Sequence, residues 1–258
     1  MEQFTTVILP YILSGISVGG QYALIAIGYT MVYGILRLIN FAHGDVFMVA
    51  GLMMVYLSAA LPLYLAVPVV ALLTVALGFV IEKIAYKPLR SAPRMSVMIS
   101  AIGVSYLLQN LALYVTGGLN KTYPTIPWIS DQVDLFGATT KRVTLITPVL
   151  TIILVILLVQ LINHTKVGMA MRAVAKDFET SQLMGIKINN VISVTFIIGS
   201  FLAAVGSMLY FSNYPGVVPT SGAMPGLKAF VAAVFGGIGS IPGAVIGAFI
   251  IGVFESLI

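Results

Sequence analysis

A short polar segment lies between two long apolar stretches and holds the residue types best suited to binding a ligand. It contains Arg37, Asn40, His43, Gly44 and Asp45. If the helical backbone is interrupted here, its unpaired backbone groups and the His43 imidazole could contact a passing solute. A structural role also fits, with Arg37 at the end of one helix and Asp45 capping the next. Asn40 and Gly44 would then form the turn, and the residues allow both roles.

A glycine-rich segment near the end of the chain is a second candidate site. It contains Gly236, Gly237, Gly239, Pro242 and Gly243. Small residues let membrane helices approach closely, so these positions could simply be a packing surface. Proline removes a backbone hydrogen bond, and such a break is tolerated where it is buried or lines a cavity. We therefore also expect a hinge or gate near Gly239, Pro242 and Gly243.

The pattern of residues 169–184 predicts a short amphipathic helix. Apolar residues recur at i, i+3, i+4 and i+7 from Met171 to Phe178, which places them on one helical face. Gly168 precedes the helix, and Gly185 follows it where a left-handed C-terminal cap is expected.

The charges on this predicted helix indicate what it could contact. Arg172 would suit a helix lying on anionic lipid headgroups. Asp177 and Glu179 would be repelled by such a surface. They favour docking in a groove of a peripheral protein instead.

The composition predicts a polytopic helical membrane protein. The 258 residues are 59% hydrophobic and only 8% charged, whereas a soluble domain carries about 25% charged residues. With no Cys and two His, disulfides and Cys- or His-rich metal centres are excluded. The chain has no phosphate-binding glycine loop followed by Lys and Ser/Thr, and no nucleophile–base pair. We therefore expect no catalytic, metal or cofactor site and no nucleic-acid partner.

We expect an all-α helical bundle over residues 1–258 as one transmembrane domain with interrupted helices. The expected spans are residues 7–36, 46–60, 64–81, 95–115, 145–162, 191–211 and, in broken form, 228–258.

The basic residues predict how these spans are oriented. The loops 82–94 and 163–190 share eight of the 13 basic residues, which predicts that both face the cytoplasm. The loop 116–144 and the N-terminus should then face outward.

Three motifs occur in the order typical of one transporter family. They are Tyr22–Gly34 with Ile39–Asp45, Gly168–Asp177 with Leu183–Ile186, and Gly236–Ala244. Together they resemble the ABC importer permeases for branched-chain amino acids, and in particular the LivH-type membrane subunit. The resemblance covers most of the chain.

The resemblance implies a transmembrane subunit that translocates leucine, isoleucine and valine across the bacterial inner membrane by alternating access. It implies two cytoplasmic ABC ATPases that bind ATP and Mg²⁺, and a periplasmic solute-binding protein. It also implies a LivM-type paralogous permease or a second copy of this chain. The helix at 169–184 would be the coupling helix, with Arg172, Asp177 and Glu179 at its rim. Met171 and Phe178 would be its anchors.

Family members usually continue into a further hydrophobic helix and a basic tail. This sequence stops at Ile258, so we expect that closing helix to be absent.

Two alternatives stay open. A paralogous permease for urea or short amides would carry the same motifs. An ion-coupled secondary transporter would need acidic residues within its spans, for which Asp45 and Glu255 are the candidates.

Overall fold

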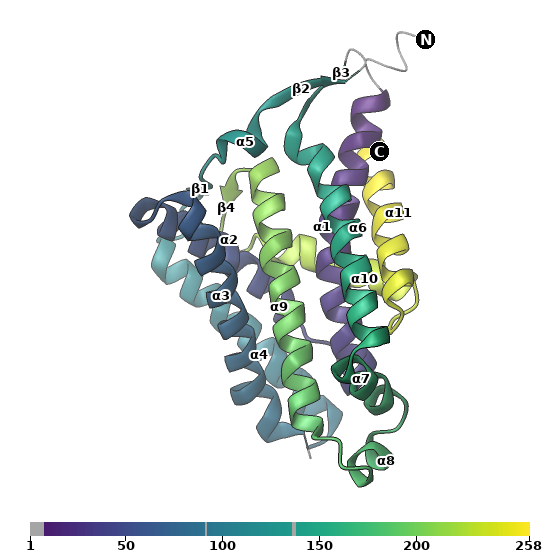
Figure 1. The fold of residues 1–258 in the computed structure, drawn as a ribbon. Coiled ribbons are helices and arrows are strands. Elements are labelled where there is room, and N and C mark those ends of the chain that lie inside the picture. The colour runs from purple at the N-terminus through teal and green to yellow at the C-terminus, as the bar shows by residue number, and fades with distance from the viewer. Residues whose placement is uncertain (1–7, 91, 136–137) are drawn as a thin grey trace.

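The computed structural model describes residues 8–90, 92–135 and 138–258. Within these residues, six helices are long and apolar enough to cross a membrane. They are α1 (Leu9–Leu36), α2 (His43–Ala60), α3 (Leu63–Ile81, extended by further helical turns to Leu89), α4 (Arg94–Thr116), α6 (Arg142–His164) and α9 (Ile188–Asn213). Two shorter apolar helices, α10 (Ala223–Phe235) and α11 (Ile241–Leu257), complete the bundle (Figure 1). The expected all-α membrane bundle is confirmed.

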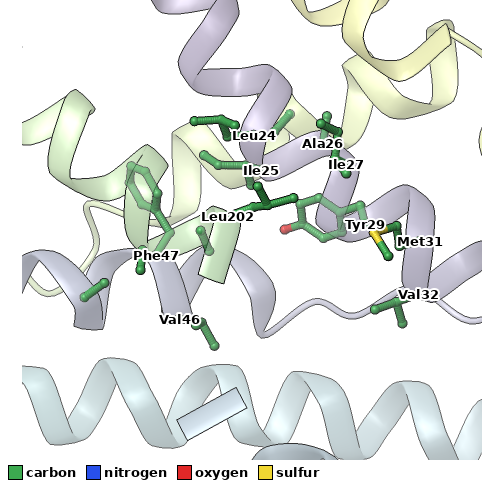
Figure 2. Close-up of a cluster of buried hydrophobic side chains, with 14 of the residues drawn as sticks. Leu24, Ile25, Ala26, Ile27, Tyr29, Met31, Val32, Val46, Phe47 and Leu202 are labelled. Atoms are coloured by element: carbon green, nitrogen blue, oxygen red, sulfur yellow. The ribbon is translucent and has the colours of Figure 1, made fainter. Parts of the chain in front are cut away.

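The helix α1 lies at the centre of the bundle and packs against α6, α9, α10 and α11. Its residues 22–27 are almost completely inaccessible to solvent. Figure 2 shows Leu24, Ile25 and Ile27 of α1 in a cluster with Phe47 of α2 and Leu202 of α9. By contrast, α4 and α6 expose many of their large apolar side chains. Such exposed apolar faces are typical of helices that contact lipid or another membrane subunit.

Glycines let α1 and α11 approach to backbone contact. A Cβ atom added at Gly19 would lie 2.7 Å from Cα of Phe249, and one at Gly15 would lie 2.8 Å from Cα of Val253. On the other helix, a Cβ at Gly252 would lie 2.3 Å from the backbone nitrogen of Gly19. This small-residue seam holds the last helix against the central one.

The short elements fall at the two ends of the bundle. One end carries α7 (Lys166–Lys176) and α8 (Phe178–Leu183). The other carries α5 (Pro127–Ser130), the hairpin of β2 (Gln132–Leu135) with β3 (Ala138–Lys141), and the antiparallel pair of β1 (Lys121–Thr122) with β4 (Gly216–Val217). The first turn of α1 and the end of α11 lie at this second end (Figure 1).

The two basic segments lie at the same end, as their charge predicts. The side chain of Arg90 donates to Oδ1 of Asn189, and the Arg37 guanidinium donates to the carbonyl oxygen of Ala175 at 3.2 Å. At the opposite end, Nζ of Lys141 donates to the carbonyl oxygen of Asn213 at 3.0 Å. The segment 116–144 is therefore separated from both basic segments by the length of the bundle (Figure 1).

Several expected boundaries need correction. The segment 82–94 is mostly helical, because α3 continues through a π-helical turn at Glu82–Tyr86 and a 3₁₀ turn at Lys87–Leu89. The segment 116–144 contains strands and a short helix where a loop was expected. The break in 228–258 is confirmed between Phe235 and Ile241, although the broken pair begins earlier, at Ala223.

Substitution of Gly19 tests the close packing of α1 on α11. We expect Gly19→Ala to destabilise the purified protein by about 1–3 kcal/mol, because the added methyl group forces the two backbones apart. Gly103→Ala on α4 is the matched control, since its Cβ would have no atom within 4 Å. Thermal unfolding in detergent should give a lower Tm for Gly19→Ala and an unchanged or higher Tm for Gly103→Ala. Equal Tm values for the two variants would contradict the close packing of α1 on α11 at Gly19.

Candidate functional site

The polar segment between α1 and α2 interrupts the helices inside the bundle. Arg37 ends α1 in the left-handed conformation, with φ of 55°. The next helix starts at His43, whose ring lies against Gly28. Gly28 precedes the end of α1 by eight residues, or about 12 Å along the helix axis. The start of α2 is therefore set back from the end of α1 into the bundle.

Asp45 has a different role from the N-cap that the sequence predicts. The N-cap position of α2 is Ala42, and Asp45 lies within the first turn. Its carboxylate accepts hydrogen bonds from two residues of α4, Oγ of Ser105 at 2.5 Å and Nε2 of Gln109 at 3.0 Å. The predicted N-cap role of Asp45 is wrong, because its carboxylate is directed toward the neighbouring helix α4.

Asn40 and His43 are both buried at this interruption. Oδ1 of Asn40 accepts a hydrogen bond from the Tyr86 hydroxyl at 2.7 Å, which ties the turn to the π-helical end of α3. The His43 ring meets Tyr29 edge-on, with ring centroids 5.1 Å apart. Its Nε2 has no hydrogen-bond partner among the described residues. Both side chains are in the protein interior, and neither lines the cavity beside Asp45.

A cavity of about 350 Å³ lies between α2, α4 and α10. Asp45, Ser105 and Gln109 supply polar groups to its wall. The remaining lining is largely aromatic, aliphatic or glycine: Tyr29, Phe41, Gly44, Ile102, Tyr106, Gly222, Ala223, Gly226, Leu227 and Phe230.

Ser105 and Gln109 were not identified from the sequence. The sequence feature that could have pointed to them is two polar residues four positions apart within an apolar span. This spacing places them on one helical face.

The start of α10 packs directly on the start of α2. A Cβ atom at Gly222 would lie 2.1 Å from the carbonyl oxygen of Gly44, and one at Gly226 would lie 3.0 Å from Cα of Gly44. Only glycine allows this approach. The two helix starts therefore meet at one wall of the cavity.

The glycine-rich segment forms the turn from α10 to α11. Gly237 and Gly239 have φ of 91° and 98°, a region that glycine adopts readily. Ser240 caps α11 by accepting from the Gly243 backbone N–H at 3.3 Å. Pro242 lies in the first turn of α11, where no intrahelical partner for its nitrogen exists. The expected helix break at Pro242 is therefore wrong: Pro242 begins a helix, and the glycines before it make the turn.

The turn from α10 to α11 lies beside the predicted coupling segment. Gly239 lines a cavity of about 100 Å³ together with Met171 and Arg172 of α7 and Gly34 of α1. Two segments singled out from the sequence thus meet at the end of the central helix.

The segment 169–184 is two helices, not the single helix expected. Thr165 caps α7 by accepting from the Gly168 N–H at 3.1 Å. Asp177 ends α7 and caps α8, accepting from the Thr180 N–H at 3.0 Å and from its hydroxyl at 2.6 Å. These bonds to Thr180 lower the pKa of Asp177 below its usual value. The break arises because Asp177 caps a new helix more readily than it continues one.

The first of these helices is fixed on the bundle. Met171 is only 4% exposed and packs inward, so the expected role of Met171 as an anchor for a partner is wrong. The Arg172 guanidinium donates to the Ile162 carbonyl oxygen at 2.6 Å and to Oδ1 of Asn163 at 3.0 Å, at the end of α6. A Cβ at Gly168 would lie 2.2 Å from the same Ile162 oxygen. The helix α7 is therefore held tightly against α6.

The second helix projects from the bundle. Phe178 is 42% exposed, and Glu179 is exposed beside it. Leu183 and Met184 are 87% and 79% exposed, although the sequence pattern did not single them out for docking. Gly185 has φ of 83°, which confirms the expected left-handed end.

A buried ion cluster lies at the same end of the bundle, and its contact with α9 was not predicted from the sequence. Glu82 is completely buried and forms ion pairs with Arg90 and, at 3.5 Å, with Lys83. Oγ of Ser193 on α9 donates to Oε2 of Glu82 at 2.9 Å. Burial lowers the pKa of Arg90, and Glu82 opposes that shift. The cluster clamps the end of α3 to the start of α9.

Removal of the Glu82 carboxylate tests this clamp. We expect Glu82→Ala to destabilise the protein by about 3–5 kcal/mol, because Arg90 is left partly buried without its counter-charge. Asp131→Ala is the control, since the Asp131–Arg142 pair is largely solvent-exposed and should contribute about 1 kcal/mol or less. Glu82→Ala should therefore unfold at a lower denaturant concentration than Asp131→Ala. The reverse order would contradict the proposed role of the cluster.

The chain matches known permeases over almost its whole length. Residues 11–258 match the family model described as the permease component of the branched-chain amino acid transport system. The chain is 40% identical to the high-affinity branched-chain amino acid transport permease LivH of Salmonella typhimurium, covering 99% of this chain and 87% of that protein. It is also 40% identical to BraD of Pseudomonas aeruginosa, covering 96% and 85% respectively.

A solved structure shares the fold. An ABC transporter of the metal-chelate type in an inward-facing conformation matches with a TM-score of 0.50 and 16% identity, covering 99% of this chain and 79% of that chain. Together with the six apolar helices, the matches identify a multi-pass membrane protein. The chain belongs to the family of permease components of branched-chain amino acid transport systems.

Proposed function

We propose that this chain is the membrane-spanning subunit of an ATP-driven importer that moves leucine, isoleucine and valine across the bacterial inner membrane. The observation that carries the proposal is its family membership, because the relatives with 40% identity are named as high-affinity branched-chain amino acid permeases. An importer for urea or short amides has no comparable support.

The partners follow from this assignment. Two cytoplasmic ATPases bind ATP and Mg²⁺ and hydrolyse the nucleotide, and a solute-binding protein delivers the amino acid at the outer face. A paralogous LivM-type permease, or a second copy of this chain, completes the membrane unit. The exposed apolar faces of α4 and α6 supply surface for lipid or for that second subunit.

The helices α7 and α8 are the proposed coupling device. Phe178, Leu183 and Met184 expose apolar surface at the end of the bundle that carries the basic residues, where a water-facing segment is otherwise polar. Glu179 and Asp177 lie beside them and supply the polar rim. A groove on one ATPase would cover this surface, with the apolar side chains as its anchors.

Movement of the ATPases would reach the bundle through α7. Its inward face is buried, and Arg37 at the end of α1 donates to its Ala175 carbonyl. Gly239, in the turn from α10 to α11, lies beside its residues Met171 and Arg172. A push on α7 would therefore act on α1 and on that turn together. Alternating access then follows if the starts of α2 and α10 separate from α4.

Leu183→Asp tests the docking surface. We expect the variant to bind the ATPases at least tenfold more weakly, which corresponds to about 1.4 kcal/mol, because a charge replaces an apolar anchor. Leu119→Asp is the matched control, an exposed leucine at the opposite end of the bundle. Affinity of the purified chain for its ATPases and leucine-stimulated ATP hydrolysis in the reconstituted complex are the measurements.

The two variants also test which end of the bundle binds the ATPases. Loss of ATPase binding in Leu119→Asp with normal binding in Leu183→Asp would place the docking surface at the wrong end. Normal binding in both variants would remove α8 from the proposed interface.

A further inference from the structure

Asp45 differs from the other carboxylates of the spanning helices because it has no cationic partner in the part of the chain that the structure describes. Glu82 is paired with Arg90 and Lys83, and Glu255 is paired with Lys228 at 2.5 Å. Asp45 is 3% exposed and meets only the neutral donors of Ser105 and Gln109 among the described residues. An ionisable side chain at membrane depth is normally paired or marks a ligand path.

The space beside this carboxylate has the size and lining of a small-molecule site. Its volume of about 350 Å³ lies at the lower end of the roughly 300–1,000 Å³ typical of ligand pockets. No Lys, Arg or His is among the described residues that line it. Phe41, Ile102, Leu227 and Phe230 provide the apolar part of the wall. One acidic group facing an apolar chamber is complementary to a ligand with one cationic end and an apolar body.

We propose that this cavity binds the amino acid during its passage, with the Asp45 carboxylate accepting hydrogen bonds from the substrate ammonium group. The inference rests on the proposed function and assigns its substrate a site. Ser105 and Gln109 are positioning residues that hold the carboxylate oriented toward the cavity. The apolar wall receives the branched side chain. The ligand ammonium supplies the counter-charge that the described protein groups do not.

A structural role for Asp45 makes a different prediction. If its hydrogen bonds only tie α2 to α4, its replacement would change stability without changing which ligands compete. Ligand competition therefore separates the two roles. The probes are 3-methylbutylamine, which is leucine without its carboxylate, and 4-methylpentanoate, which is leucine without its ammonium group.

The experiment measures binding of labelled L-leucine and labelled 3-methylbutylamine to the purified permease–ATPase complex without the solute-binding protein. We expect the amine to compete with leucine and 4-methylpentanoate to fail. In Asp45→Asn, binding of both labelled ligands should weaken at least tenfold while the Tm of the complex stays close to wild type. Wild-type affinity in Asp45→Asn, or equal competition by the acid and the amine, overturns the proposal. So does the absence of ligand binding to the wild-type complex.

A second pair of variants tests the chamber without touching the carboxylate. Ile102→Trp should fill the cavity and weaken leucine binding at least tenfold. Ile99→Trp, one turn earlier on α4 and 64% exposed, should bind as wild type does. Equal binding by both variants counts against the site.

Failure of the site and failure of the proposed function have different signatures. ATP-driven leucine uptake that persists with unaltered affinity in Asp45→Asn overturns the site alone. A wild-type complex that does not take up leucine with ATP overturns the proposed function. Binding of the amine that depends on Asp45 would still support a site for cationic ligands.

Discussion

The structure depends on one constraint: unpaired backbone groups and charges cannot face hydrocarbon. Each unsatisfied group costs several kcal/mol in a bilayer, so helix interruptions must be enclosed by protein. Both interruptions here obey it. The break between α1 and α2 is enclosed by α3, α4 and α10, and the turn between α10 and α11 lies against α1 and α7. A central helix, α1, whose middle section is buried, makes that enclosure possible (Figure 1, Figure 2).

Polar contacts at these interruptions also connect distant parts of the molecule. Tyr86, at the π-helical end of α3, donates to Asn40 in the first interruption, and Glu82 of the same turn is clamped to α9. Arg37 links that interruption to α7. The polar groups at one end of the bundle therefore connect α7, which leads into the projecting helix α8, to the broken helices.

The sequence predicts the elements well and the contacts between them poorly. Long apolar runs mark the spans within a few residues because burial in lipid permits little else. The left-handed end at Gly185 and the break among Gly236–Gly239 were also predictable, since glycine favours those conformations. The partners of Asp45 were not, because Ser105 and Gln109 are 60 or more positions away and a single sequence carries no record of tertiary pairing. The inward direction of Met171 and the break at Asp177 depend in the same way on α6 and on a local cap.

Uptake of labelled leucine by proteoliposomes tests most directly whether this bundle is a gate driven from outside. We expect uptake only when the ATPases, the solute-binding protein and ATP are all present. We also expect a protonophore to leave that uptake unchanged. Leucine uptake by this chain alone, or uptake that collapses with the proton gradient while ATP is plentiful, would contradict it.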